Sequence, residues 1–166
     1  MKTGMLKLII TITCAAFILC GCNESGKIWA KYSKESFCAT IRYELSGTEI
    51  CAKVRVERET LRDTVTVEFS SPEALRGAIG RIDRGEYRID CSGTERGGEA
   101  ARLLLKIPEA LSARDAISFE KLDVEGTAFI AAQTERSRIV FDVKTQMPVR
   151  AEAYGTVCDI ITFSWR

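Results

Sequence analysis

Alternation of apolar and polar residues dominates the chain after residue 36 and predicts a long antiparallel sheet. In FCATIRYEL (37–45) and ICAKVRVE (50–57), every second residue is apolar. A period of two is typical of strands with one buried face. The Ser46-Gly47 pair between these runs predicts a two-residue hairpin turn, which places Leu45 opposite Thr48. The chain is therefore expected to begin its folded part with a hairpin.

The same alternation recurs to the C-terminus and predicts roughly nine strands in all. The further strands are expected at 64–69, 78–82, 87–91, 127–134, 138–143, 149–154 and 157–165. The fold class predicted from them is mainly β (α+β), a curved antiparallel sheet that forms an incomplete barrel covered by one or two short helices.

Four other stretches interrupt this pattern. SPEALRG (71–77) predicts a short helix, in which Ser71 can cap the first turn and Pro72 can occupy the first helical position. SGTERGGEA (92–100) is expected to be a solvent loop, and residues 103–107 a buried strand or an apolar connector. SARD at 112–115 resembles a capping box and predicts a helix through about residue 122.

The N-terminal residues predict an export signal. Lys2 and Lys7 precede residues 8–19, which contain no charge, and this run is too short to span a bilayer comfortably but suits the core of a secretion signal. It ends in LCGC (19–22), which resembles a bacterial lipobox with Cys22 as the lipidated residue. The alternative is a plain secreted protein, or a retained helix with incidental cysteines.

This motif predicts three parts of the chain. Residues 1–21 are expected to be a lipoprotein signal peptide, 22–35 a lipid-anchored tether, and 36–166 a single domain. Several acyl chains on Cys22, palmitate among them, would hold the protein stably on the outer side of the bacterial cell membrane, because each buried CH2 contributes about 0.8 kcal/mol.

Charge and composition exclude several function classes. The chain has 24 Lys and Arg residues and 23 Asp and Glu residues, and loss of residues 1–21 would remove two lysines and no acid, leaving one net negative charge. The two signs are interspersed, whereas nucleic-acid binding usually needs a basic stripe, so no nucleic-acid partner is expected. The sequence contains no histidine and shows no nucleophile with a base. We therefore expect no enzymatic activity, no cofactor and no metal.

Four cysteines remain in the expected mature domain once Cys22 is lipidated: Cys38, Cys51, Cys91 and Cys158. An even number outside the cytoplasm permits two disulfides, and four cysteines allow three connectivities. The predicted hairpin register places Cys38 opposite Arg55 and Cys51 opposite Arg42, which is too far apart for a bond between the two cysteines. The other connectivities, and four reduced thiols, stay open.

Two stretches resemble a known superfamily. VEFSSPEALRG and VFDVKTQMPVRAEA, with the order of predicted elements, resemble small clostridial-type lipoproteins related to the LolA-like lipoprotein-carrier superfamily. In its strand-turn-strand signature, an acidic residue precedes a Thr-Gly pair and a proline. Asp142, Thr145 and Pro148 match this signature, and Gln146 stands where the glycine is common. The resemblance implies a strongly curved, incomplete antiparallel barrel whose open side is covered by helices, leaving an apolar concave face.

Two functions are compatible with this fold. In the first, the concave face binds an apolar ligand, such as an acyl chain, a lipopeptide or the lipidated end of another protein. In the second, the interior is filled, and a non-enzymatic envelope scaffold or sensor binds a protein partner through its rim or edge strands. A continuous apolar cavity would favour the first and a packed interior the second. The residues expected to line the concave face are Ile41, Tyr43, Val54, Val56, Val65, Val67, Phe69, Phe129, Phe141, Ile161 and Phe163.

Overall fold

The first two alternating runs form the predicted hairpin. In the computed structural model, which describes residues 24–60 and 62–166, strands β1 (Phe37–Leu45) and β2 (Thr48–Arg58) pair with Leu45 opposite Thr48. The turn residues Ser46 and Gly47 have φ values of 51° and 79°, as a tight hairpin turn between twisted strands requires. The predicted register, and with it the separation of Cys38 from Cys51, is confirmed.

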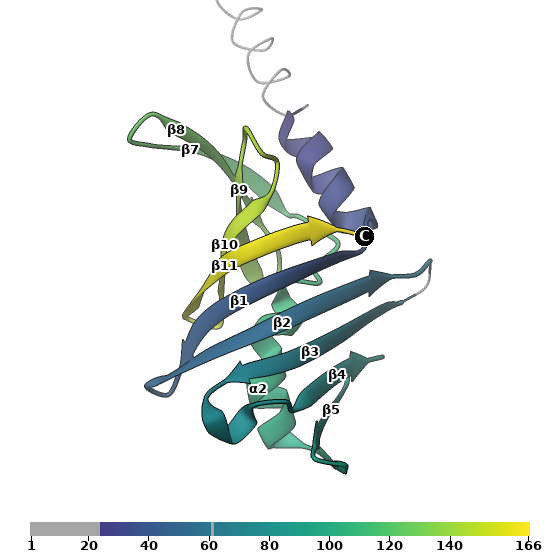
Figure 1. Cartoon of the computed structure of the whole chain (residues 1–166). Coiled ribbons are helices and arrows are strands. Elements are labelled where there is room, and N and C mark those ends of the chain that lie inside the picture. The colour runs from purple at the N-terminus through teal and green to yellow at the C-terminus, as the bar shows by residue number, and fades with distance from the viewer. Residues whose placement is uncertain (1–23, 61) are drawn as a thin grey trace, which may run out of the picture.

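The strands form one open antiparallel sheet of eleven strands, in the order β6-β5-β4-β3-β2-β1-β11-β10-β9-β8-β7. Pairing of β1 with β11 joins the N-terminal and C-terminal halves of the sheet (Figure 1). The predicted fold class, a curved antiparallel sheet with short covering helices, is confirmed. The remaining strands are β3 (Asp63–Ser71), β4 (Ile79–Asp83), β5 (Glu86–Cys91), β6 (Thr94–Gly97), β7 (Ser118–Val124), β8 (Thr127–Gln133), β9 (Ser137–Asp142), β10 (Pro148–Ala153) and β11 (Thr156–Trp165).

Three predictions between residues 71 and 111 are corrected. Residues 103–107 belong to helix α2 (Glu99–Ala110), because the apolar run continues a helical stripe that starts at Ala101 and includes Leu105. The loop predicted at 92–100 contains β6 and the start of α2. SPEALRG forms only a single 3-10 turn, η1 (Glu73–Leu75), and the Ser71 hydroxyl accepts a hydrogen bond from the Cys51 N–H instead of capping it.

The helix predicted from SARD is also absent from the described structure. Residues 112–117 connect α2 to β7, and β7 pairs with β8 through a turn in which Glu125 and Gly126 both have positive φ. This turn fixes a hairpin, so that strand pairing prevails over a weak helical signal.

An additional helix covers residues 24–34, within the segment expected to be a tether. Ser25, Ile28, Trp29 and Tyr32 are buried at helical spacing, and the last three belong to the hydrophobic core. Sequence analysis missed this helix, and the packed domain therefore begins before residue 36. Cys22 and residues 1–21 lie outside the described residues.

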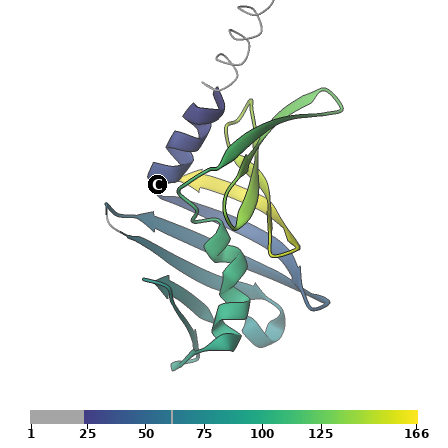
Figure 2. The same cartoon turned by 180° about the vertical axis from the view of Figure 1, so that it is seen from behind.

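Both helices lie on the same side of the sheet (Figure 2). Helix α2 packs on β3, β4 and β5, and the N-terminal helix packs against aromatic side chains of β1, β9 and β11. Gly80 of β4 allows the close approach of α2, because a Cβ atom there would lie 2.4 Å from Cδ2 of Leu105. The core is therefore enclosed between the concave side of the sheet and the two helices.

If the N-terminal helix is part of the domain, replacing Trp29 by alanine should lower the free energy of unfolding by about 3 to 5 kcal/mol, as for other buried aromatic side chains. Lys34→Ala, on the exposed side of the same helix, should change it by no more than about 0.5 kcal/mol. Urea unfolding followed by circular dichroism measures both, and equal stability of the two variants would show that the helix does not pack on the sheet.

Candidate functional site

Most residues expected on the concave face lie there. Side chains of β1, β2, β3 and β9 point between the sheet and the helices, and Phe163 of β11 packs against them while partly buried. The fully or nearly fully buried members of the predicted face are Ile41, Tyr43, Val54, Val56, Val65, Val67, Phe69 and Phe141.

Two predicted residues do not lie on the concave face. A β-bulge shifts the β1–β11 register between Thr40 and Ile41, so Ile160 lies opposite Ile41 and Ile161 is 54% exposed. Phe129 stands on the outer side of β8, and its neighbour Ile130 is the buried residue. Alternation alone cannot reveal a bulge or decide which of two adjacent apolar residues points inward.

Aromatic side chains of the N-terminal helix fill the part of the concave face around Phe37 and Phe141. The Tyr32 ring lies 5.1 Å from the Phe37 ring and 5.1 Å from the Phe141 ring, measured between centroids. Trp29 contacts Phe141 edge-on at 6.1 Å. Such pairs stabilise by about 0.5 to 1.5 kcal/mol each beyond the burial of their area. The face expected to receive an apolar ligand is thus occupied by the protein's own side chains.

Side chains of helix α2 fill the part of the concave face formed by β3, β4 and β5. Leu105 is fully buried against β4, and the Tyr43 hydroxyl donates a hydrogen bond to the Leu104 carbonyl at 2.9 Å. The Tyr32 hydroxyl donates to the carbonyl of Leu111, just after the helix. Both buried hydroxyls therefore have acceptors within the protein, as a packed interior requires.

Tyr32, Tyr43 and Cys158 stay neutral near physiological pH. Burial raises the pKa values of the Tyr32 and Tyr43 hydroxyls well above their usual range, although Arg58 acts in the opposite direction on Tyr32. Burial, with a smaller contribution from Asp159, raises the pKa of the Cys158 thiol to about 12. These three buried side chains therefore add no charge to the interior near physiological pH.

A buried arginine connects the N-terminal helix to the sheet. The Arg58 side chain is 2% exposed, and its Nη1 lies 2.7 Å from Oδ2 of Asp63. Arg58 also donates to the carbonyls of Tyr32 and Ser112 at 3.2 and 2.5 Å. Arg114 pairs with both oxygens of the same aspartate, at 2.6 and 3.0 Å. Three segments distant in sequence thus meet at one ion-pair network.

One hollow on the surface is a polar groove of about 480 Å³ beside α2. It is lined by Leu103 and Lys106 of α2, by Tyr87 of β5, and by Arg136 and Tyr154 from turns in the C-terminal half of the sheet. The remaining lining residues are Glu99, Arg102 and Glu109. We call this set of eight residues the α2 groove, and in it the Arg136 side chain reaches across to Glu109 of α2.

Contacts within the α2 groove hold its polar side chains in place. The Tyr87 hydroxyl donates to Oε2 of Glu109 at 2.7 Å, and Arg136 binds Oε1 of the same carboxylate at 3.2 Å. The Lys106 ammonium lies over the Tyr154 ring, 5.4 Å from its centroid. Burial and the bond to Glu109 raise the pKa of Tyr87 to about 12. The groove therefore presents tyrosine rings and a preformed arrangement of charges.

A second, apolar hollow lies on the outer side of the sheet. It has a volume of about 370 Å³ and includes Phe129. Charged residues, among them Arg138 and Glu152, border it. Its apolar lining consists of Leu122, Val124, Phe129, Val140 and Val149.

The four cysteines of the domain are free thiols in the structure. Cys91 is exposed and Cys158 is buried, with Cys38 and Cys51 between these extremes. Among residues 24–60 and 62–166, no cluster of three His, Cys, Asp or Glu side chains could hold a metal ion. In the same described part of the chain, no helix has the length and apolar character needed to cross a membrane.

The sequence matches no family model and no curated protein. Two solved structures show a similar fold. One is an uncharacterized conserved protein from Thermus thermophilus, 12% identical, with 88% of each chain covered and a TM-score of 0.52. The other is MucB, 13% identical, with 87% of this chain but 58% of MucB covered and a TM-score of 0.52.

A LolA superfamily protein, NE2245 from Nitrosomonas europaea, is also similar. It is 11% identical, with 86% of this chain and 93% of that chain covered and a TM-score of 0.42. At these identities the likeness to the Thermus protein and to MucB concerns the fold. The open curved sheet with covering helices nevertheless agrees with the architecture implied by the LolA-like resemblance.

Phe141 offers a test of whether the concave face is filled or able to bind an apolar ligand. In a packed interior, Phe141→Ala should lower the free energy of unfolding by about 3 to 5 kcal/mol, because it removes a buried ring between Trp29 and Tyr32. Thermal or chemical unfolding measures this loss. A fluorescent fatty acid should bind neither the wild type nor the variant. Saturable binding by the wild type, weakened in Phe141→Ala, would instead establish a ligand cavity.

Proposed function

We propose that the protein is an extracytoplasmic lipoprotein, anchored to the bacterial membrane through Cys22, that binds a protein partner through its outer surface and catalyses no reaction. The filled concave face carries this proposal. An acyl chain would have to displace Trp29 and Tyr32, whose side chains are 7% and 0% exposed. Displacement would also break the hydrogen bonds of these two residues to Arg114 and Leu111.

The α2 groove is the surface that best fits a protein partner. Tyrosine and arginine contribute most often to the affinity of protein interfaces, and the groove contains two tyrosines and two arginines beside the exposed Leu103. Glu109 already orients the Tyr87 and Arg136 side chains, so ordering these two on binding would cost less entropy. Both acidic and basic groups line it, which favours a partner segment with both charges and an apolar anchor.

The lipid anchor fits the position of the N-terminal helix. Cys22 precedes the first described residue, Glu24, by two positions, and a fully extended chain of that length spans about 7 Å. The helix from residue 24 packs on the sheet. A lipidated Cys22 would therefore hold the folded domain close to the membrane surface.

MucB provides a comparison for protein binding on this fold. A crystal structure records MucB in complex with MucA(peri), with a TM-score of 0.46 to this chain. That interaction belongs to MucB, and the proposal for this chain rests on its filled concave face and on the α2 groove.

A photo-crosslinking amino acid in place of Leu103 should capture one partner of defined mass in the native host. Leu103 is 44% exposed in the groove, and Ile79, 37% exposed on the outer face of β4, provides a matched control position. Mass spectrometry of the adducts should identify the same protein in each preparation from position 103 and not from position 79. Arg136→Glu should abolish the adduct, because it reverses one charge of the groove. Equal adducts from both positions would refute a role for the groove.

Cys22→Ser should prevent incorporation of radiolabelled palmitate, because the acyl chains need the sulfur of that residue. Cys20→Ala should label like the wild type, since a small residue suffices at that position of the motif. Labelling followed by electrophoresis compares the three proteins. Incorporation of palmitate into Cys22→Ser at the wild-type level would disprove anchoring through this residue. It would not affect the proposal of partner binding, which the crosslinking experiment tests separately.

A further inference from the structure

Strand β7 (Ser118–Val124) ends the sheet, and its outer edge has no neighbouring strand among the described residues. The β7–β8 hairpin projects beyond the other strands in both views (Figures 1 and 2). Every residue of β7 except Leu122 is exposed. The strand therefore offers a row of backbone N–H and C=O groups to another strand.

The two faces of β7 differ in chemistry. Leu122 and Val124 line the outer apolar hollow together with Phe129, which lies directly opposite Leu122. Alternation puts Lys121 and Asp123 on the other face, the one from which Phe119 contacts the Trp29 ring. A strand added to β7 would thus meet Leu122, Val124 and the ion-paired Glu120 on one side and a Lys-x-Asp pattern on the other.

This pattern is complementary to itself. In an antiparallel pair of identical strands that continue one sheet, opposed residues share a face, so the central pair consists of the same residue from each copy. Three such registers overlap at least five residues of β7, and they centre on Glu120, Lys121 or Leu122. The first two place like charges directly opposite each other, which is destabilising.

The register centred on Leu122 has the opposite character. It places Lys121 opposite Asp123 of the second copy, and by symmetry this ion pair forms twice on the same face. On the other face, Leu122 meets Leu122 of the second copy, next to Phe129 in each molecule. Glu120 lies opposite Val124 there and keeps its ion pair with Arg138 of its own chain. The apolar hollows of the two copies would then lie side by side, with the two Leu122 side chains in contact between them.

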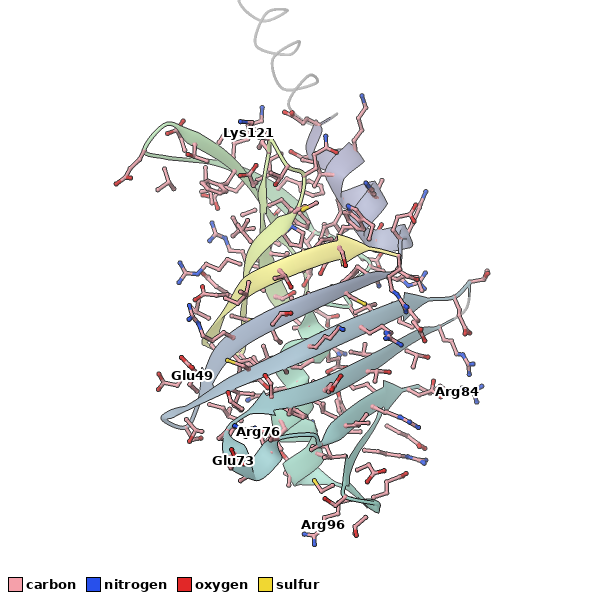
Figure 3. The ribbon with its side chains drawn as sticks, viewed as in Figure 1. Glu49, Glu73, Arg76, Arg84, Arg96 and Lys121 are labelled. Atoms are coloured by element: carbon pink, nitrogen blue, oxygen red, sulfur yellow. The ribbon has the colours of Figure 1, made fainter. Side chains whose placement is uncertain are left out.

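The other sheet edge lacks this property. Strand β6 (Thr94–Gly97) is a four-residue strand, and the registers that overlap most of it centre on Glu95 or Arg96, so each puts like charges opposite each other. Figure 3 shows Arg96 and Lys121 at opposite ends of the molecule. The two edges therefore provide an internal comparison, in which only β7 among the described edges is suited to pairing with itself.

We propose that β7 pairs with β7 of a second copy, in the antiparallel register centred on Leu122, and that the protein forms a two-fold symmetric dimer. This inference is independent of the partner-binding proposal, because the α2 groove shares no residue with β7 or with the outer apolar hollow. The dimer would close the sheet edge and cover Leu122, Val124 and Phe129.

Charge reversal tests the register with side chains that are exposed in the folded chain. Lys121→Asp and Asp123→Lys should each raise the dimer dissociation constant about tenfold or more, because each replaces two attractive cross-strand pairs by two repulsive ones. The double variant, Lys121→Asp with Asp123→Lys, should dimerise like the wild type. Analytical ultracentrifugation of the purified full chain in density-matched detergent, over a range of protein concentrations, gives the constants.

Mixing the two single variants provides a more specific readout. One copy then carries two aspartates and the other two lysines at positions 121 and 123, so a heterodimer should form from two proteins that are monomeric alone. Glu95→Lys, on the β6 edge, should leave the dissociation constant unchanged. A wild type that stays monomeric at the highest concentration, or a double variant that remains as weak as the single ones, would overturn the proposal. Circular dichroism confirms that each variant is folded.

Discussion

The ion-pair network around Arg58 is the contact on which the arrangement of the domain depends. A guanidinium that is 2% exposed is tolerated only when its charge is neutralised and its donors are bound, and Asp63 supplies the charge while the carbonyls of Tyr32 and Ser112 supply acceptors. Its Nε atom alone has no partner among the described residues. Because these groups come from the N-terminal helix, the β2–β3 hairpin and the connector after α2, the network fixes both covering helices relative to the sheet.

That placement decides which surfaces remain for binding. With Tyr32 held at the network, its ring and the Trp29 ring occupy the region of Phe37 and Phe141, and α2 occupies the other half of the concave side. The apolar side that the fold would otherwise present is used for internal packing. Binding is thereby displaced to the exterior, where the two hollows described here differ in chemistry: one is lined by tyrosines and charges, the other by aliphatic side chains and Phe129.

Strand positions could be read from the sequence because a buried face imposes a period of two that no other element shares. This held for β1, β2 and the four closing strands, whose bounds agree with the prediction within about one residue at most ends. The α2 groove could not be read in this way, because Tyr87, Lys106 and Arg136 come from separate elements and only the curvature of the sheet brings them together. The N-terminal helix was missed since its apolar residues, Ile28, Trp29 and Tyr32, are few and stand next to a segment with the features of an export signal.

The same alternation that builds the core also leaves an apolar surface outside it. Along β8, Ile130 is buried within the core, whereas Phe129 next to it faces outward, and both are large hydrophobic residues. A strand that needs only one apolar face to fold has no structural reason to place phenylalanine on the other face. Burial of Phe129 against Leu122 is incomplete within one chain, because β7 is the last strand of the sheet. The composition of this outer face is therefore explained more simply by contact with a further strand than by the folding of the single chain.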